Sequence, residues 1–172
     1  IGYTETEGTA KILGIVKDGE LVDSADIDEE VLLILDRTPF YAESGGQVGD
    51  TGVIENGAFS FDVQDTVKSP SGVWIHVGSA SAGMVKVGEE VSAKIDVDRR
   101  HDIMRNHTAA HLLQAALREV LGTHVEQAGQ LVDQNYVRFD FTHFSAMTDE
   151  ELRKVENRVN EVILENIPVV TR

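Results

Sequence analysis

The hydrophobic pattern of this chain changes its period at Asp98, which divides the 172 residues into two parts of different fold class. Before Asp98, short apolar stretches are separated by turn signals about every 8–12 residues, a pattern typical of a small antiparallel barrel or sandwich. After Asp98, apolar side chains recur at the 3.6-residue spacing of a helix. We therefore predict an α+β fold of two domains, with a small antiparallel β-barrel at 1–97 and an α/β domain at 98–172.

The first domain is predicted to consist of short strands joined by tight turns. Asp18-Gly19 is a favoured hairpin turn, and the apolar run at 31–35 is short enough to be a buried strand. Residues 78–83, bounded by two glycines, are assigned to a turn. The predicted strands are 8–17, 20–22, 31–35, 52–54, 58–67, 72–77 and 90–97.

The second domain is predicted to begin with a helix at 99–121. Asp98 is a suitable N-cap for this helix, and Gly122 is a suitable stop. Two strands are expected next, at 124–132 and 136–142.

A second helix is predicted from 149 to about 165. Thr148 and Glu151 form the capping box that opens it, and Pro168 is expected to end it. A strand is expected to begin at Val169-Val170, so we expect the domain to be cut off at residue 172. The predicted apolar face of the helix consists of Leu152, Val155, Val159, Val162 and Ile163.

The first predicted helix carries two histidines, His107 and His111, four residues apart. Residues at i and i+4 lie on one face of a helix, and two imidazoles so placed can bind one divalent metal ion, most often zinc. A zinc site needs a third or fourth protein ligand, and the chain has no cysteine to supply it. The alternative is a chance pair on an amphipathic helix. The other histidines are expected to be ordinary surface or strand residues, one of which could still complete a site: His76, His101, His124 and His143.

The net charge of −15 argues against a chain that grips a nucleic-acid backbone by itself, because phosphate contacts need clustered Lys and Arg. Arg99, Arg100 and Arg105 are expected to be solvated charges at the start of the helix. No apolar run approaches the roughly 20 residues of a membrane span, so no membrane partner is expected. The lack of cysteine excludes disulfides and agrees with a cytoplasmic location.

A glycine-rich loop is predicted at 38–52, with four glycines in the eight residues from Gly45 to Gly52. Such a loop can adopt positive φ angles and lets another backbone or a ligand approach closely. It lacks the Gly-Lys-Ser/Thr ending of a phosphate-binding loop and is not a GxGxxG motif. The structural alternative is a tight connection between barrel strands.

The two motifs together resemble the alanyl-tRNA synthetase family. Residues 39–52 (Pro-Phe-Tyr-Ala-Glu-Ser-Gly-Gly-Gln-Val-Gly-Asp-Thr-Gly) resemble its glycine-rich motif, and residues 105–113 (Arg-Asn-His-Thr-Ala-Ala-His-Leu-Leu) resemble its editing-domain HxxxH motif. Residues 122–127 and 137–141 are also similar to the family. The resemblance covers almost the whole chain, and the order and spacing of the two motifs make it specific.

The resemblance implies a role for each part of the chain. The first domain would be the translation-factor-like barrel that precedes the editing module, and the second would be the first part of the editing domain. That domain hydrolyses tRNA(Ala) mischarged with serine or glycine. His107 and His111 would be zinc ligands, and Gln127, by default a polar residue facing solvent, would be the candidate catalytic residue. The residues expected at the tRNA acceptor end are Glu43, Ser44, Gly45, Gly46, Gln47, Gly49, Asp50, Gly52, Arg105 and Thr108.

The family's remaining zinc ligands, a Cys and a His in a CxxxH motif, are expected beyond residue 172, which leaves the metal site incomplete here. ATP is expected only in the aminoacylation domain upstream. Because Ile1-Gly2-Tyr3 has no initiator Met, we expect an excised, by itself inactive, segment of a synthetase, with tRNA held mainly by other domains and its oligomeric state open. The alternatives are a free-standing editing protein and a non-catalytic tRNA-docking or spacer module.

Overall fold

A computed structural model describes residues 5–168, so the strand expected at Val169-Val170 lies outside the described residues. The described chain divides into two compact units between His101 and Asp102. The boundary falls inside helix α1 (Val97–Leu121), so the first turn of this helix belongs to the first unit.

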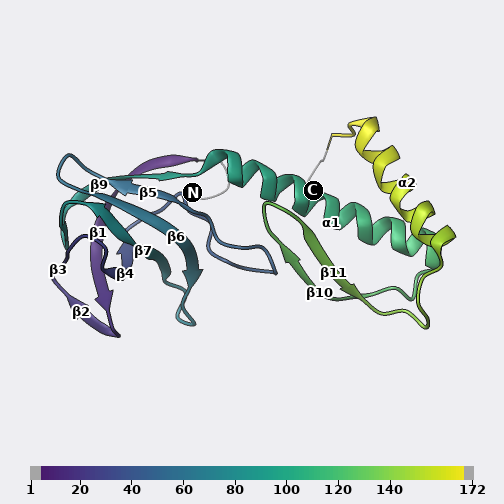
Figure 1. Ribbon diagram of the computed structural model, residues 1–172, viewed down its shortest axis with the longest axis horizontal. Coiled ribbons are helices and arrows are strands. Elements are labelled where there is room, and N and C mark those ends of the chain that lie inside the picture. The colour runs from purple at the N-terminus through teal and green to yellow at the C-terminus, as the bar shows by residue number, and fades with distance from the viewer. Residues whose placement is uncertain (1–4, 169–172) are drawn as a thin grey trace. The chain divides into compact units, whose positions relative to one another are not determined.

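The first unit is a closed antiparallel barrel, as predicted (Figure 1). Its six strands follow the order β1-β4-β7-β6-β5-β9, and β9 pairs with β1 to close it. Three short strands, β2, β3 and β8, lie outside this ring. The bounds are β1 (Glu7–Lys17), β2 (Glu20–Val22), β3 (Ser24–Ala25), β4 (Glu30–Leu35), β5 (Gly52–Glu55), β6 (Ser60–Lys68), β7 (Trp74–Ala82), β8 (Val85–Lys86) and β9 (Glu90–Ile95).

Strand β1 closes the barrel because it is long enough to pair with two neighbouring strands. Its first half, from Glu7 to Lys11, pairs with β9, and its second half, from Ile12 to Val16, pairs with β4. The register shifts between Ile12 and Gly14, which marks a β-bulge. Because a bulge bends a strand and increases its twist, one strand can serve both neighbours of a small barrel.

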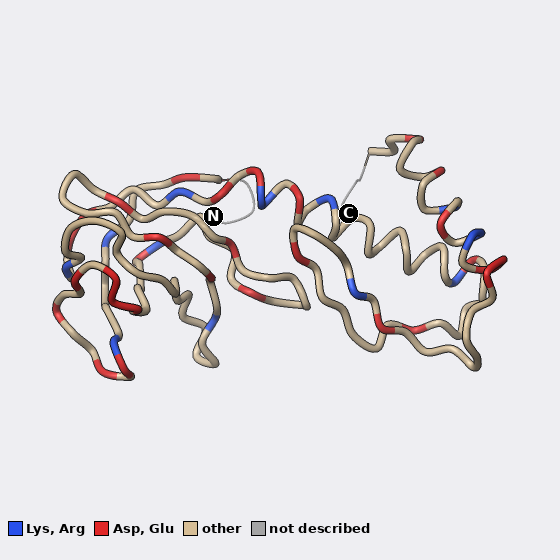
Figure 2. Tube along the Cα trace, in the orientation of Figure 1, with Lys and Arg blue, Asp and Glu red and all other residues tan. Residues whose placement is uncertain are grey.

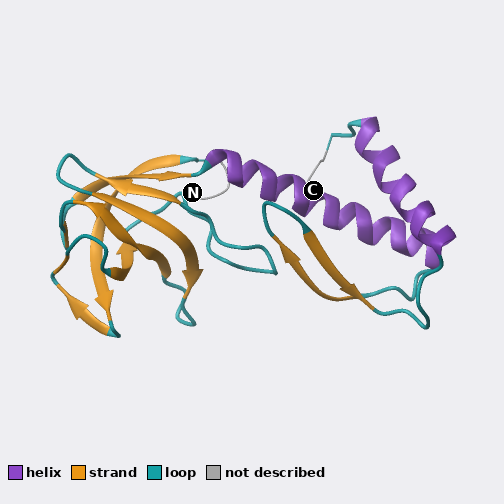
Figure 3. Ribbon diagram, in the orientation of Figure 1, coloured by secondary structure: helices purple, strands orange, loops and turns teal. Residues whose placement is uncertain are grey.

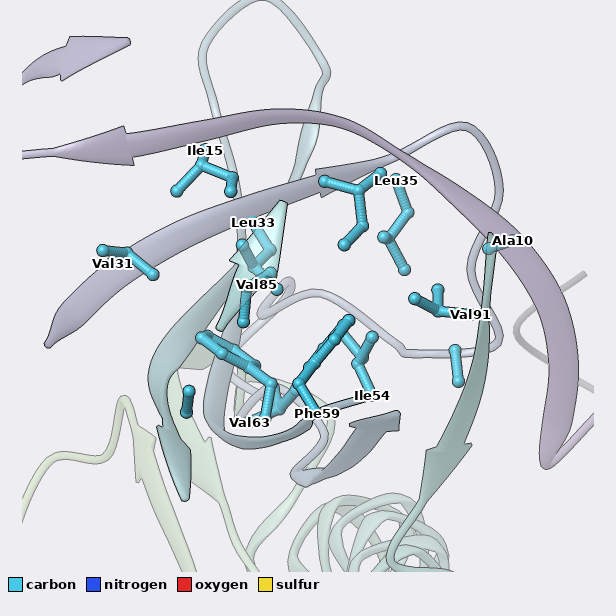
Figure 4. Close-up of a cluster of buried hydrophobic side chains, with 14 of the residues drawn as sticks. Ala10, Ile15, Val31, Leu33, Leu35, Ile54, Phe59, Val63, Val85 and Val91 are labelled. Carbon is cyan, nitrogen blue, oxygen red and sulfur yellow. The ribbon is translucent and has the colours of Figure 1, made fainter. Parts of the chain in front are cut away.

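Alternation along the strands builds the core of the barrel. On β4, Val31, Leu33 and Leu35 are buried and point inward, while the residues between them are only half-buried. Figure 4 shows these side chains meeting those of Ile54, Val63 and Val91 from the other side of the barrel. The period of two expected of a strand with one buried face thus accounts for the interior.

The turn predicted at 78–83 is wrong, because β7 continues to Ala82. Gly78 lies inside this strand, opposite Val63 of β6. A Cβ atom at Gly78 would be 1.9 Å from the carbonyl oxygen of Asp62, so glycine is required there for close strand approach. The turn follows at Gly83, whose φ is 71°.

The second unit consists of most of α1, the hairpin β10 (Gln127–Val132) and β11 (Val137–Phe141), and α2 (Asp149–Glu165) (Figure 3). A small core of Ala116, Leu117, Val125 and Val155, with Phe139 and Phe141 of β11 packed against it, joins the three parts. The α+β class and the order of these elements agree with the prediction. Strand β10 begins three residues later than expected.

The N-cap predicted at Asp98 is wrong, because the carboxylate of Asp96 accepts the hydrogen bond from the Arg99 amide (3.0 Å). Helix α1 therefore starts at Val97, two residues before the predicted start. Its predicted end is confirmed, since α1 ends at Leu121 and Gly122 follows with a φ of 119°.

The capping box of α2 is confirmed, with Thr148 as N-cap and Glu151 bonded back to it. The helix ends at Asn166, in the left-handed conformation, rather than through Pro168. Of the predicted apolar face, only Val155 is buried, while Leu152 and Ile163 are exposed.

Candidate functional site: the histidine pair and the glycine-rich loop

His107 and His111 lie together on α1, as the spacing predicts. Their rings are nearly parallel, with centroids 5.3 Å apart and an interplanar angle of 4°. His107 is partly buried and His111 is exposed. Partial burial, and after it the neighbouring imidazole of His111, lower the pKa of His107. A neutral imidazole is the form that binds a metal ion.

The described residues fit a metal ion only in part. The two imidazoles supply nitrogen donors of the type that zinc prefers. No group of three or more His, Cys, Asp or Glu side chains within residues 5–168 could hold a metal ion. Two imidazoles alone do not complete a zinc site, so any further ligands would have to come from outside the described part of the chain.

Strand β10 runs back along α1, because two side chains of the helix bond to backbone carbonyls at either end of the strand. Arg118 donates to the carbonyl of Val125 (2.8 Å), and Asn106 donates to that of Asp133 (2.7 Å). Gln127, two residues after Val125, is exposed and lies nearer to the level of Arg118 than to that of His107. A register shift between Gln127 and Gly129 places a bulge at this position.

Arg105 and Thr108 lie on a different part of the helix surface. They line an apolar groove of about 780 Å³ between α1 and α2, together with Leu112, Ile163 and Ile167. Neither His107 nor His111 is among the described residues that line it. The Arg105 guanidinium pairs with Asp102, and the Thr108 hydroxyl donates to the Met104 carbonyl (3.1 Å).

The glycine-rich loop connects β4 to β5 and is closed at its base by Tyr41 and Asp50. The Asp50 amide donates to the Tyr41 carbonyl (2.9 Å), and the Tyr41 amide donates to the Asp50 carboxylate (2.7 Å). The hydroxyl of Thr66 on β6 donates to the Asp50 carbonyl (2.8 Å). The loop is therefore a structured element of the barrel.

The glycines of the loop have two distinct causes. Gly45 and Gly46, with φ angles of 61° and 82°, form the tight turn between Ser44 and Gln47, whose backbones bond reciprocally. At Gly49, a Cβ atom would lie 2.0 Å from the Thr66 carbonyl oxygen. Both expectations from the sequence, positive φ angles and close backbone approach, are confirmed.

Most of the loop residues expected to bind tRNA are shielded from solvent. Gln47, Gly49 and Asp50 are buried, and Gly46 and Gly52 are half-buried. The exposed part is Glu43-Ser44-Gly45, which we call the loop tip. Direct contact with a large ligand would therefore be made by the loop tip, and the other loop residues hold the tip in place.

Arg99 and Arg100 were expected to be solvated, and for Arg100 this is wrong. Arg100 is 7% exposed, and its guanidinium pairs with the Asp50 carboxylate (Nε–Oδ1 2.9 Å). Arg99 donates to the carbonyl of Gly49 (2.8 Å). The partners are fifty residues apart in sequence, so no local signal could have identified them.

A family model of class II (A) tRNA synthetases matches residues 1–99, more than half of the chain. The chain belongs to this family. Among curated relatives, the alanine–tRNA ligase of Acetivibrio thermocellus is 55% identical over 172 residues, which is all of this chain and 20% of the relative. Those of Chelativorans sp. and Bacillus velezensis are 48% and 45% identical, covering 100% and 98% of this chain. The chain thus spans about a fifth of the length of these ligases.

Three other histidines of this synthetase-family chain are also in defined surroundings. His76, on β7, is fully buried, and burial lowers its pKa to about 4. His124 and His143 share a hydrogen bond (2.9 Å) in the second unit, and the His124 ring stacks on Phe144. The sequence predicted a strand residue for His76, which is confirmed, but not the His124–His143 pair.

Acidic residues outnumber basic ones in both units (Figure 2). Lys and Arg are interspersed among them along the chain. Among the described residues, no helix combines the length and apolar character of a membrane span.

Proposed function

We propose that this chain is part of an alanine–tRNA ligase and serves its hydrolytic editing, the removal of serine or glycine from mischarged tRNA(Ala). The observation that carries the proposal is the stacked His107–His111 pair on one face of α1. Identity of 55% over the whole chain to an alanine–tRNA ligase supports the ligase as the parent protein.

A physical need for editing follows from the size of alanine. An alanine pocket cannot strongly reject the smaller glycine, because one methyl group is worth only about 1–3 kcal/mol. Serine adds a hydroxyl group that an apolar pocket also rejects poorly. A second, hydrolytic site corrects both errors.

His107 and His111 would provide two of the ligands of a zinc ion, with the others from parts of the protein beyond the described residues. Zinc, when bound, would position the aminoacyl group or activate a water molecule. Gln127, exposed at the start of β10, would contact the aminoacyl group or help to exclude alanine.

The tRNA partner is proposed to meet this chain through a small surface. In the first unit this surface is the loop tip; in the second it includes Arg105 and Thr108, which are both exposed. Because the chain is acidic, other domains would supply most of the phosphate contacts. ATP would be used only by the aminoacylation domain of the whole ligase.

A second candidate function is a non-catalytic docking module for tRNA. The incomplete donor set within the described residues favours it. The two functions differ in whether the histidine pair is needed for hydrolysis.

The test is hydrolysis of seryl-tRNA(Ala) by the full-length protein with His107→Ala or His111→Ala. His101→Ala, an exposed histidine on the same helix, is the matched control. Editing predicts loss of hydrolysis in the first two variants, with aminoacylation retained and the control active. Full hydrolysis in all three would leave the docking module as the better account.

A further inference from the structure

The first turn of α1 holds both ends of the glycine-rich loop. At the beginning of the loop, Arg100 donates from Nη2 to the Pro39 carbonyl (3.2 Å). At its end, the same guanidinium pairs with the Asp50 carboxylate, and Arg99 donates to the Gly49 carbonyl. All of these residues lie in the first unit.

The ion pair at the centre of this arrangement is almost fully removed from water. Asp50 is 2% exposed, and its carboxylate also accepts the Tyr41 amide. Buried charges are tolerated only when they are paired and hydrogen-bonded, so Arg100 and Asp50 are confined to one arrangement. The loop tip, in contrast, is exposed.

Three backbone bonds connect this anchor to the tip. The Asp50 amide bonds to Tyr41 (2.9 Å), the Glu43 amide bonds to the Thr66 carbonyl (2.8 Å), and the Gln47 amide closes the turn onto Ser44 (3.0 Å). The Tyr41 hydroxyl also donates to the Ser44 carbonyl (3.2 Å). A change at the anchor is therefore transmitted to the tip through short, defined contacts.

We propose that Arg100 and Asp50 are positioning residues that present the loop tip to the acceptor end of the tRNA. The inference rests on the proposed function for its substrate. Both side chains are buried, so neither can contact a large ligand directly, and a substitution at either one would act on it through the loop that they hold. The loop tip then contributes binding energy that is lost when the anchor is loosened.

The experiment compares Arg100→Lys and Asp50→Asn in the full-length protein. Lysine keeps the charge but loses the two-pronged guanidinium, and asparagine keeps the shape but loses the charge. Val91→Ala, a truncation in the barrel core on β9, is the control for a general loss of stability. The measurements are KM and kcat for hydrolysis of seryl-tRNA(Ala), and hydrogen exchange of the Glu43, Gln47 and Asp50 amides.

Both anchor variants are expected to raise KM by about tenfold with kcat within about twofold, because they weaken the binding of the ground state and of the transition state equally. The three loop amides are expected to exchange faster in them. In Val91→Ala, KM and these amides should stay as in the unchanged protein. If Arg100 and Asp50 only stabilised the fold, KM and the exchange of these amides would change in Val91→Ala as they do in the anchor variants.

Unchanged exchange of the loop amides in both anchor variants would overturn the proposal, as would an equal rise in KM in the control. If the unchanged protein does not hydrolyse seryl-tRNA(Ala), the proposed function fails and the tRNA-presenting role fails with it. The exchange data then still decide whether Arg100 and Asp50 hold the loop.

Discussion

His76 donates a hydrogen bond from Nδ1 to the carbonyl oxygen of Leu33 (3.0 Å), deep inside the barrel. Its Nε2 then accepts from the Thr38 hydroxyl (2.8 Å), which in turn accepts from the Phe40 amide (3.1 Å). The neutral imidazole therefore joins β4 and β7 to the segment that leads into the glycine-rich loop.

This arrangement predicts loss of barrel stability in acid. The folded pKa of His76, about 4, lies below the value of 6.5 for an unburied histidine, so the unfolded chain binds more protons between these values. Stability should fall as the pH decreases from 6.5 to 4, by up to about 3 kcal/mol for this group. Urea unfolding across this range measures it. His76→Gln should reduce the dependence of the unfolding free energy on pH, and His101→Gln should leave this dependence unchanged. An unchanged pH dependence in His76→Gln would refute the assignment.

We predict that position 49 has no room for any residue larger than glycine. A Cβ atom would lie 2.0 Å from the Thr66 carbonyl oxygen, so Gly49→Ala should cost about 2–3 kcal/mol through overpacking. Gly57→Ala, with open space around the glycine, is the matched control and should be near neutral. Denaturant midpoints of the two variants test this. Equal midpoints would mean that β6 can move away from the added methyl group at little cost in free energy.

A buried and an exposed ion pair of the first unit are predicted to differ in their contribution to stability. Arg100→Met leaves the buried Asp50 carboxylate without its cation and should cost about 3–5 kcal/mol. Lys94→Met breaks an exposed pair with Glu55 and should cost at most about 1 kcal/mol. Urea unfolding measures both costs, provided that the dependence of the unfolding free energy on urea concentration is the same in the two variants. A similar cost for both would show that burial of the Arg100–Asp50 pair is not what matters.

The N-cap of α2 allows a local test of the second unit. Thr148 accepts the Glu151 amide (3.2 Å), so Thr148→Ala should cost about 1 kcal/mol of unfolding free energy. Thr148→Ser keeps the hydroxyl and should restore most of it. Thermal unfolding of the unit gives both values, and an equal loss in the serine variant would rule out the capping bond as the cause.

The acidic charge predicts weak tRNA binding by the isolated chain. With 30 acidic and 15 basic residues, the chain cannot release many counterions from a phosphate backbone. We expect a Kd weaker than about micromolar at physiological salt, measured by fluorescence anisotropy with tRNA(Ala). Sub-micromolar binding would contradict the inference from charge.

Local signals in the sequence predicted much of the fold. The capping box at Thr148, the stop at Gly122 and the hairpin turn at Asp18-Gly19 depend on neighbouring residues only, and all three are confirmed. The N-cap of α1 was misplaced because Asp96 and Asp98 have the same chemistry, and only the backbone geometry distinguishes them.

Long-range pairings could not be predicted in the same way. Gly78 was interpreted as a turn because glycine is a local breaker signal, whereas its real cause is the approach of Asp62 from another strand. Arg100 and Asp50 meet only because the barrel brings the loop onto the first turn of α1. For the candidate site, the His107–His111 pair follows from helical spacing, but the burial of Gln47, Gly49 and Asp50 does not.

The most direct test of editing is the rate at which the full-length protein hydrolyses seryl-tRNA(Ala) compared with alanyl-tRNA(Ala). An editing site that corrects serine errors predicts much faster hydrolysis of the seryl ester, with the alanyl ester nearly stable. Equal rates for the two esters, or no hydrolysis above the spontaneous rate, would contradict the proposed function.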